Sequence, residues 1–198
     1  MADTTIQWTD TTWNPTTGCD RISAGCDNCY ALTMAARLKG MGQAKYQNDG
    51  DPRTSGPGFG ITTHPDALDA PLRWRKPRKV FVNSMSDLFH ARVPDEFIAQ
   101  VFATMARTPQ HTYQVLTKRP RRARRLLDAD GSRLLEATTD DERTAAAIHD
   151  GPWPLPNVWL GASVENQEQA GLRIGELLET DAAVRFLSCE PLIGPVDL

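Results

Sequence analysis

Three cysteines near the N-terminus are the residues of this sequence best suited to chemistry. Cys19, Cys26 and Cys29 fall within eleven positions, whereas the fourth cysteine, Cys189, lies far along the chain. Clustered thiolates bind zinc or iron–sulfur clusters, and in a reducing compartment they are poor candidates for disulfides. The spacing therefore predicts that Cys19, Cys26 and Cys29 hold one metal centre.

The number of clustered cysteines favours an iron–sulfur cluster over zinc. A structural zinc ion normally has four protein ligands, whereas a [4Fe–4S] cluster held by three cysteines leaves one iron open to a substrate or cofactor. An open iron points to an enzyme. Zinc stays an alternative because a fourth ligand can come from elsewhere in the chain, and reduced thiols without metal are a third interpretation. The candidates for a fourth zinc ligand are Cys189, His64, His90 and His111.

The residues around the cysteines also favour a metal centre. Gly18 and Gly25 allow the loop to turn sharply. Apolar residues at helical spacing over Ala31–Leu38 predict an amphipathic helix that begins directly after Cys29. A helix N-terminus lowers the pKa of a thiol and stabilises a negatively charged thiolate cluster.

The cysteine loop resembles the cluster loop of radical S-adenosylmethionine (radical SAM) enzymes. Six residues separate Cys19 from Cys26, two separate Cys26 from Cys29, and Tyr30 follows. The usual first spacing in that superfamily is three residues, so the match is partial. The resemblance implies that the open iron binds S-adenosylmethionine, and that reductive cleavage of this cofactor yields a carbon radical that acts on a substrate. It also implies an electron donor protein.

A closer resemblance extends over most of the chain. The sequence is similar to a phage- and prophage-encoded family of uncertain function that carries a three-cysteine motif. Members of that family continue past the position of Leu198 with another strand and helix, so the resemblance implies that this chain is truncated at its C-terminus. The similar segments are Trp8–Asp10 with Trp13–Pro15, Asn83–Phe89, Gln114–Pro120, Ser163–Asn166 and Ser188–Leu192.

Short apolar runs alternate with helical patterns, which is typical of β/α units around a parallel sheet. Apolar periodicity also predicts helices over Pro94–Arg107 and Asn166–Glu179. At roughly 30 residues per unit, 198 residues predict an α/β fold with a partial, open, TIM-barrel-like β/α barrel of about five or six units. A doubly wound open sheet stays an alternative. The expected strands are Lys79–Val82, Thr112–Leu116, Asn157–Gly161 and Val184–Leu187, with a weaker one at Ile6–Trp8.

One domain is expected over residues 1–198, with two excursions from the barrel. Residues 42–63 are rich in Gly, Pro, Asn and Asp and show little periodicity. Residues 128–156 are expected to carry a helix over Leu134–Ile148 before a proline-rich stretch.

Polar residues follow the predicted strands, where barrel enzymes place their binding groups. Because parallel strands end on one side of a sheet, these residues are expected to face the cysteine loop. No catalytic acid, base or nucleophile can be assigned from the residues. The predicted cofactor-binding residues are Tyr30, Asn83, Ser84, Ser163, Glu165 and Glu190.

A basic segment, Lys118–Arg125, follows one predicted strand. Cations near a helix N-terminus oppose the helix dipole, so helix stability alone does not explain them. One interpretation is contact with a nucleic acid or a phosphate-bearing substrate. The other is a solvated face that is neutralised by neighbouring acids, namely Asp128, Asp130 and Asp140–Glu142.

Net charge, the length of the apolar runs and the N-terminal sequence exclude some classes of function. A net charge of −3 gives no global attraction to nucleic acid, and no apolar run approaches the roughly 20 residues that span a bilayer. The N-terminus lacks a secretory pattern, so a cytoplasmic protein is expected. Two hypotheses follow: a radical SAM-type iron–sulfur enzyme, and a zinc- or cluster-stabilised nucleic-acid-binding module without catalysis.

Overall fold

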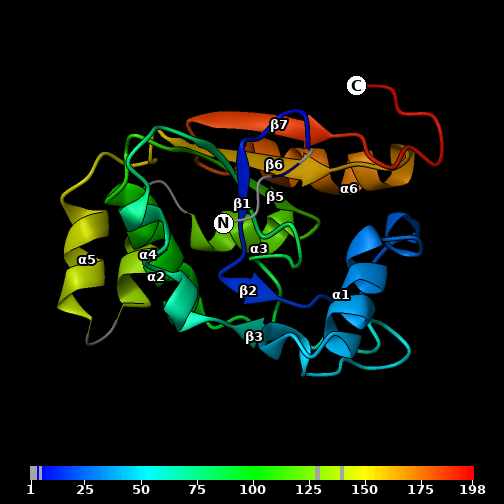
Figure 1. Cartoon of the computed structure of the whole chain (residues 1–198). Helices are drawn as coiled ribbons and strands as arrows, with labels where there is room; N and C mark the ends of the chain where they lie inside the picture. The colour runs from blue at the N-terminus through cyan, green and yellow to red at the C-terminus, as the bar shows by residue number, and fades with distance from the viewer. Residues whose placement is uncertain (1–3, 5, 128–129, 139–140) are drawn as a thin grey trace.

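A single parallel sheet organises the chain in the computed structural model, which describes residues 4, 6–127, 130–138 and 141–198. Its spatial order, β1-β4-β5-β6-β7, is also the order of these strands along the chain (Figure 1). All four pairings are parallel. The strands are β1 (Thr11–Trp13), β4 (Lys79–Val82), β5 (Thr112–Thr117), β6 (Val158–Ser163) and β7 (Val184–Ser188).

The strand order decides between the two folds that the sequence left open. A doubly wound sheet reverses its direction of growth at a switch point, whereas here each strand is added to the same edge. The structure therefore confirms an α/β fold consistent with a partial open β/α barrel. The described residues contain four strand-plus-helix units and a fifth strand, so the number of complete units is below the expected five or six.

Helices connect the parallel strands, and short 3-10 turns occur in the loops. The predicted helices after Cys29, after Pro94 and after Asn166 are all present. The α-helices are α1 (Tyr30–Gly40), α2 (Asp95–Ala106), α3 (Pro120–Leu126), α4 (Ser132–Glu136), α5 (Glu142–His149) and α6 (Gln167–Leu178). The 3-10 turns are η1 (Ala24–Cys26), η2 (Ala44–Tyr46), η3 (Pro65–Ala67) and η4 (Pro71–Arg73). In the described ranges, none of the helices is both long and apolar enough to cross a membrane.

The main core lies between the sheet and α2. The apolar stripe predicted for this helix is buried throughout, with Ile98 and Val101 fully inaccessible. Central strand residues Val82, Val115 and Leu160 are equally buried. Burial of such side chains stabilises a fold by about 1.5–3 kcal/mol each, so this core fixes the strand ends that carry the site.

The first strand differs from its prediction. Strand β1 covers Thr11–Trp13, while Ile6–Trp8 is not a strand. Pairing starts only where Asp10 Oδ2 accepts a hydrogen bond from the Lys79 backbone N–H at 2.7 Å. From Thr11 on, alternate side chains of β1 are buried. The apolar residues at Ile6–Trp8 therefore do not mark the strand that was predicted there.

The helix predicted over Leu134–Ile148 is also wrong as a single element. It is divided into α4 and α5, because Asp141 caps a new helix by accepting a hydrogen bond from the Thr144 N–H at 3.0 Å. Within this excursion, residues 128–129 and 139–140 lie outside the described part of the chain.

The last strand and helix are more exposed than predicted. Val184 in β7 is 38% exposed, and Leu178, which was expected on the buried face of α6, is 64% exposed. Arg173 is buried on that face instead. The physical reason is position: β7 is the edge strand, and no described strand pairs with its outer side.

The first excursion, residues 42–63, is hydrogen-bonded to the segment that leads into the cysteine loop. It ends in β3 (Thr62–Thr63), which pairs antiparallel with β2 (Thr16–Thr17), two residues before Cys19. The Thr54 hydroxyl donates a hydrogen bond to Asp20 Oδ1 at 2.7 Å. The excursion therefore braces the start of the cysteine loop.

Candidate functional site

The cysteine loop begins at the C-terminal end of the sheet. The Gly18 N–H donates a hydrogen bond to the Met85 carbonyl at 3.0 Å, just after β4. Gly18 has a φ of +89°, and a Cβ at this position would lie 2.2 Å from the Gly60 carbonyl oxygen. Only glycine fits there, so backbone contacts on two sides hold Cys19 in place.

The second half of the loop is pressed against Glu165. A Cβ on Gly25 would lie 2.9 Å from the Glu165 carboxyl carbon, so glycine allows this close approach. Cys26 ends the turn η1, and Cys29 is the N-cap residue of α1. The helix therefore starts at the last cysteine, as predicted.

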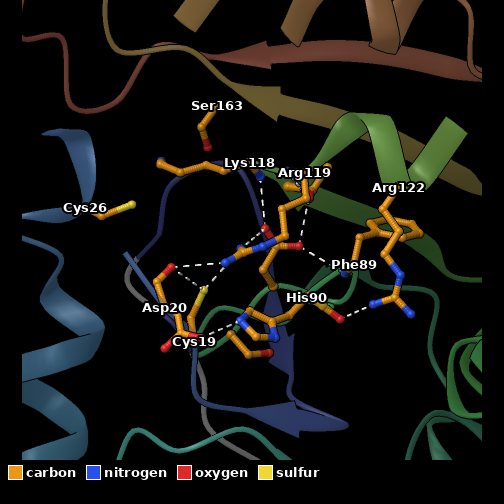
Figure 2. A network of polar contacts seen from close by, with 12 residues as sticks. Cys19, Asp20, Cys26, Phe89, His90, Lys118, Arg119, Arg122 and Ser163 are labelled. Atoms are coloured by element: carbon orange, nitrogen blue, oxygen red, sulfur yellow. Dashed lines mark hydrogen bonds and ion pairs between the residues drawn. The ribbon is translucent and has the colours of Figure 1, made fainter. Parts of the chain in front are cut away.

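A partly buried arginine links Cys19 to an aspartate. Arg119 Nη1 donates to Cys19 Sγ at 3.4 Å and to Asp87 Oδ2 at 2.9 Å, and its Nη2 donates to the Asp20 carbonyl at 3.1 Å (Figure 2). Asp87 also accepts hydrogen bonds from the Thr117 hydroxyl and the Lys118 N–H. The loop is thus joined to the ends of both β4 and β5.

The network controls the charge of Cys19. Burial, followed by the negative charges of Asp87 and Cys26, raises the pKa of the Cys19 thiol to about 12, against the opposing effect of Arg119. Cys19 is therefore a neutral thiol near pH 7, and a metal must displace its proton on binding. Figure 2 shows Cys19 within this network and Cys26 beside it.

A second buried ion pair supports the loop from the other side. Arg173 Nη1 donates to Glu165 Oε2 at 2.7 Å, and Arg173 Nη2 donates to the Ser23 hydroxyl at 3.0 Å. The Ser23 hydroxyl in turn donates to Glu165. Burial alone would raise the pKa of Glu165, but the Ser23 hydrogen bond and the charges of Arg173 and Lys118 keep it below its ordinary value.

Three of the six predicted cofactor-binding residues, Tyr30, Ser84 and Glu165, have contacts beside the cysteine loop. The Tyr30 hydroxyl donates to the Ser84 carbonyl, and Ser84 also bonds to Asn14 at the end of β1. Glu165 contacts the loop directly, as described above. Ser163 is buried at the end of β6, the corresponding end of its own strand.

Asn83 and Glu190 differ in their surroundings. Asn83 is 2% exposed and adopts a φ of +62°, a backbone conformation that is uncommon outside glycine. Its Nδ2 donor is buried and has no hydrogen-bond partner among the described residues. Glu190 is exposed after β7, and no hydrogen bond joins it to the loop in the described ranges.

The histidines proposed as zinc ligands are engaged elsewhere. His64 bonds to the Thr17 hydroxyl, His90 bonds to Asp20, and His111 lies 3.3 Å from the Pro71 carbonyl oxygen. Among the residues that the structure describes, no group of three His, Cys, Asp or Glu side chains is arranged to hold a metal ion. Convergence of Cys19, Cys26 and Cys29 on one centre therefore stays a prediction.

Several polar residues of the site were missed from the sequence. Asp87 and Arg119 lie inside segments that carried the family resemblance, but nothing in their spacing indicated that they pair. Arg173 had a usable signal: it shares a helix face with Ala170 and Leu177, and an arginine on a buried face requires a partner.

A family model covers nearly the whole chain. The model for a family of proteins of unknown function, DUF5131, matches residues 3–198. The chain belongs to the DUF5131 family. A search of curated proteins and a search of solved structures both give no match. Membership of DUF5131 assigns no reaction, so the chemistry has to be argued from the site.

Proposed function

We propose that this DUF5131 protein is an iron–sulfur enzyme of the radical SAM type, in which Cys19, Cys26 and Cys29 hold a [4Fe–4S] cluster. The observation that carries this proposal is the charged hydrogen bond from Arg119 to Cys19 Sγ at 3.4 Å. A partly exposed cysteine with a guanidinium fixed against its sulfur is better suited to bind a metal than to fill a core.

The residues present fit such a cluster. Hydrogen bonds to cysteine sulfur and local positive charge stabilise an anionic cluster and tune its reduction potential. Arg119 supplies both, and Asp87 fixes its orientation. The N-terminus of α1 adds a favourable dipole at Cys29. Three cysteines would leave one iron for an external ligand.

When bound, the cluster would supply a coordination position for S-adenosylmethionine and the electron that cleaves it. The protein would bind and orient the cofactor with groups around the loop. Asn83 Nδ2 is a free buried donor for an acceptor atom of the cofactor. Glu165 offers a carboxylate that stays ionised. Tyr30 and Ser84 join α1 to the end of β4 and so hold the mouth of the site together.

The test is anaerobic reconstitution with iron and sulfide, followed by metal analysis and electron paramagnetic resonance of the reduced protein with and without S-adenosylmethionine. The parent chain and a Cys189→Ala control should retain one [4Fe–4S] cluster whose signal changes when the cofactor is added. Single Cys19→Ala, Cys26→Ala and Cys29→Ala variants should lose it. Stoichiometric zinc in place of iron, or loss of metal in Cys189→Ala, would overturn the proposal.

The zinc-stabilised module is distinguished by the same measurement. A closed zinc site needs a fourth protein ligand. Each histidine near the loop already bonds to another group, which disfavours that closure. A protein that binds zinc and never consumes S-adenosylmethionine would belong to this second class.

A further inference from the structure

A solvent-open groove of about 1140 Å³ lies beside the cysteine site, between the loop before α2, the helix α3 and the helix α6. Its lining is strongly cationic, because six arginines face only two acidic residues, Asp95 and Glu176. The arginines are Arg92, Arg119, Arg121, Arg122, Arg124 and Arg125.

Two of these arginines connect the elements that line the groove. Arg122 donates to the carbonyl oxygens of His90 and Val93 and to Asp95, so it ties α3 to the loop before α2. Arg124 pairs with Glu176 at 3.1 Å and so ties α3 to α6. Their charges are already engaged.

Arg121 and Arg125 are different. Both are exposed on α3 and stand four residues apart, which places them about 6 Å apart on one helix face. In the described ranges, Arg121 has no hydrogen bond or ion pair, and Arg125 has only a long contact of 3.9 Å with Asp95. Of the acids expected to neutralise this segment, Asp128 and Asp140 lie outside the described residues.

We propose that this groove binds the phosphodiester backbone of a nucleic acid, which is the substrate of the enzyme proposed above. Guanidinium groups match phosphate oxygens in bidentate geometry, and two exposed arginines on one helix face suit a polymer that repeats its negative charge. Because the net charge is −3, this attraction is local to the groove.

Arg119 connects the groove with the cysteine site. Its side chain lines the groove and also donates to Cys19 Sγ. A backbone held by Arg121 and Arg125 would therefore place neighbouring nucleotides at the mouth of the site. This placement rests on the proposed function, whereas backbone binding by the groove can be tested without it.

The experiment measures fluorescence anisotropy of labelled single-stranded DNA, duplex DNA and RNA oligonucleotides with the cluster-free chain over a series of potassium chloride concentrations. Arg121→Ala with Arg125→Ala removes the two exposed cations of this helix face. The matched control, Arg75→Ala with Lys76→Ala, removes two exposed cations that precede the N-terminal end of β4 and do not line the groove.

The parent chain and the control should bind with the same salt slope. Each phosphate contact contributes about 0.7 to that slope for a single strand and about 0.9 for a duplex, so the arginine variant should flatten it by about 1.4 to 1.8. Its affinity near physiological salt should fall on the order of tenfold.

Three results would overturn the inference: no binding of any oligonucleotide, equal slopes for the arginine variant and the parent, or full competition by a mononucleotide at matched phosphate concentration. None of them affects cluster content, which is measured separately by reconstitution. Conversely, a chain that binds nucleic acid but holds no cluster would contradict the proposed function and leave the groove assignment standing.

Discussion

Arg119 and Arg121 are two residues apart and have opposite surroundings. Arg119 precedes α3, is largely buried, and bonds to Asp87 and Cys19. Arg121 lies on the exposed face of α3, and the described part of the chain gives it no partner. Pro120 begins the helix and separates them. The basic segment therefore contains two environments, since one arginine is bonded to the cysteine loop and the other is exposed.

Two ion pairs between an arginine and a glutamate differ in the same way, because one is buried and the other is exposed. The side chains of Arg173 and Glu165 are 5% and 1% exposed, whereas those of Arg124 and Glu176 are 46% and 26% exposed. Water screens the second pair and not the first, so loss of one partner should have very different consequences.

The largest expected effect is on stability after Glu165→Ala. This variant leaves Arg173 buried without its counter-charge, and removal of one member of a buried pair costs about 3–5 kcal/mol in the free energy of unfolding. Urea denaturation followed by circular dichroism measures it. Glu165→Gln, which keeps a hydrogen-bond acceptor, should lose less. A Glu165→Gln variant as stable as the parent chain would show that the charge of Glu165 is unimportant.

The next effect concerns metal retention by the Arg119→Met variant. Removing a group that hydrogen-bonds a metal ligand typically weakens metal affinity by about 10- to 100-fold. After reconstitution, the variant should lose iron to a chelator faster than the parent chain, while Arg121→Ala should match the parent. Identical iron loss in Arg119→Met would remove this arginine from the proposed cluster environment.

Both predictions concern residues whose contacts could not be predicted from the sequence. Lys79–Val82 and α2 were predictable because apolar periodicity is local. Asp87 and Arg119 are 32 positions apart, and Arg173 and Ser23 are 150 apart, so only the folded sheet shows these contacts. Glu165, Tyr30 and Ser84 do lie beside the cysteine loop, while their role in cofactor binding stays a prediction.

A smaller effect is expected from acid. The folded protein holds the pKa of Glu165 below its ordinary value of 4.5, because Ser23 and Arg173 outweigh the opposite effect of burial. A depressed carboxyl pKa contributes stability above about pH 4.5, and this contribution is lost as the pH falls through the folded-state pKa. The stability difference between the parent and Glu165→Gln should therefore shrink in acid. A constant difference at all pH values would assign the effect to packing.

The smallest effect is expected for Arg124→Ala, which breaks the exposed ion pairs with Glu176 and Glu179. Exposed pairs contribute about 0.2–1 kcal/mol and are screened by salt, so the unfolding free energy should change by no more than that and converge with the parent at high salt. Urea denaturation at low and high potassium chloride measures both. A salt-independent loss comparable to that of Glu165→Ala would mean that the link from α3 to α6 is part of the core, and the contrast between the two pairs would fail.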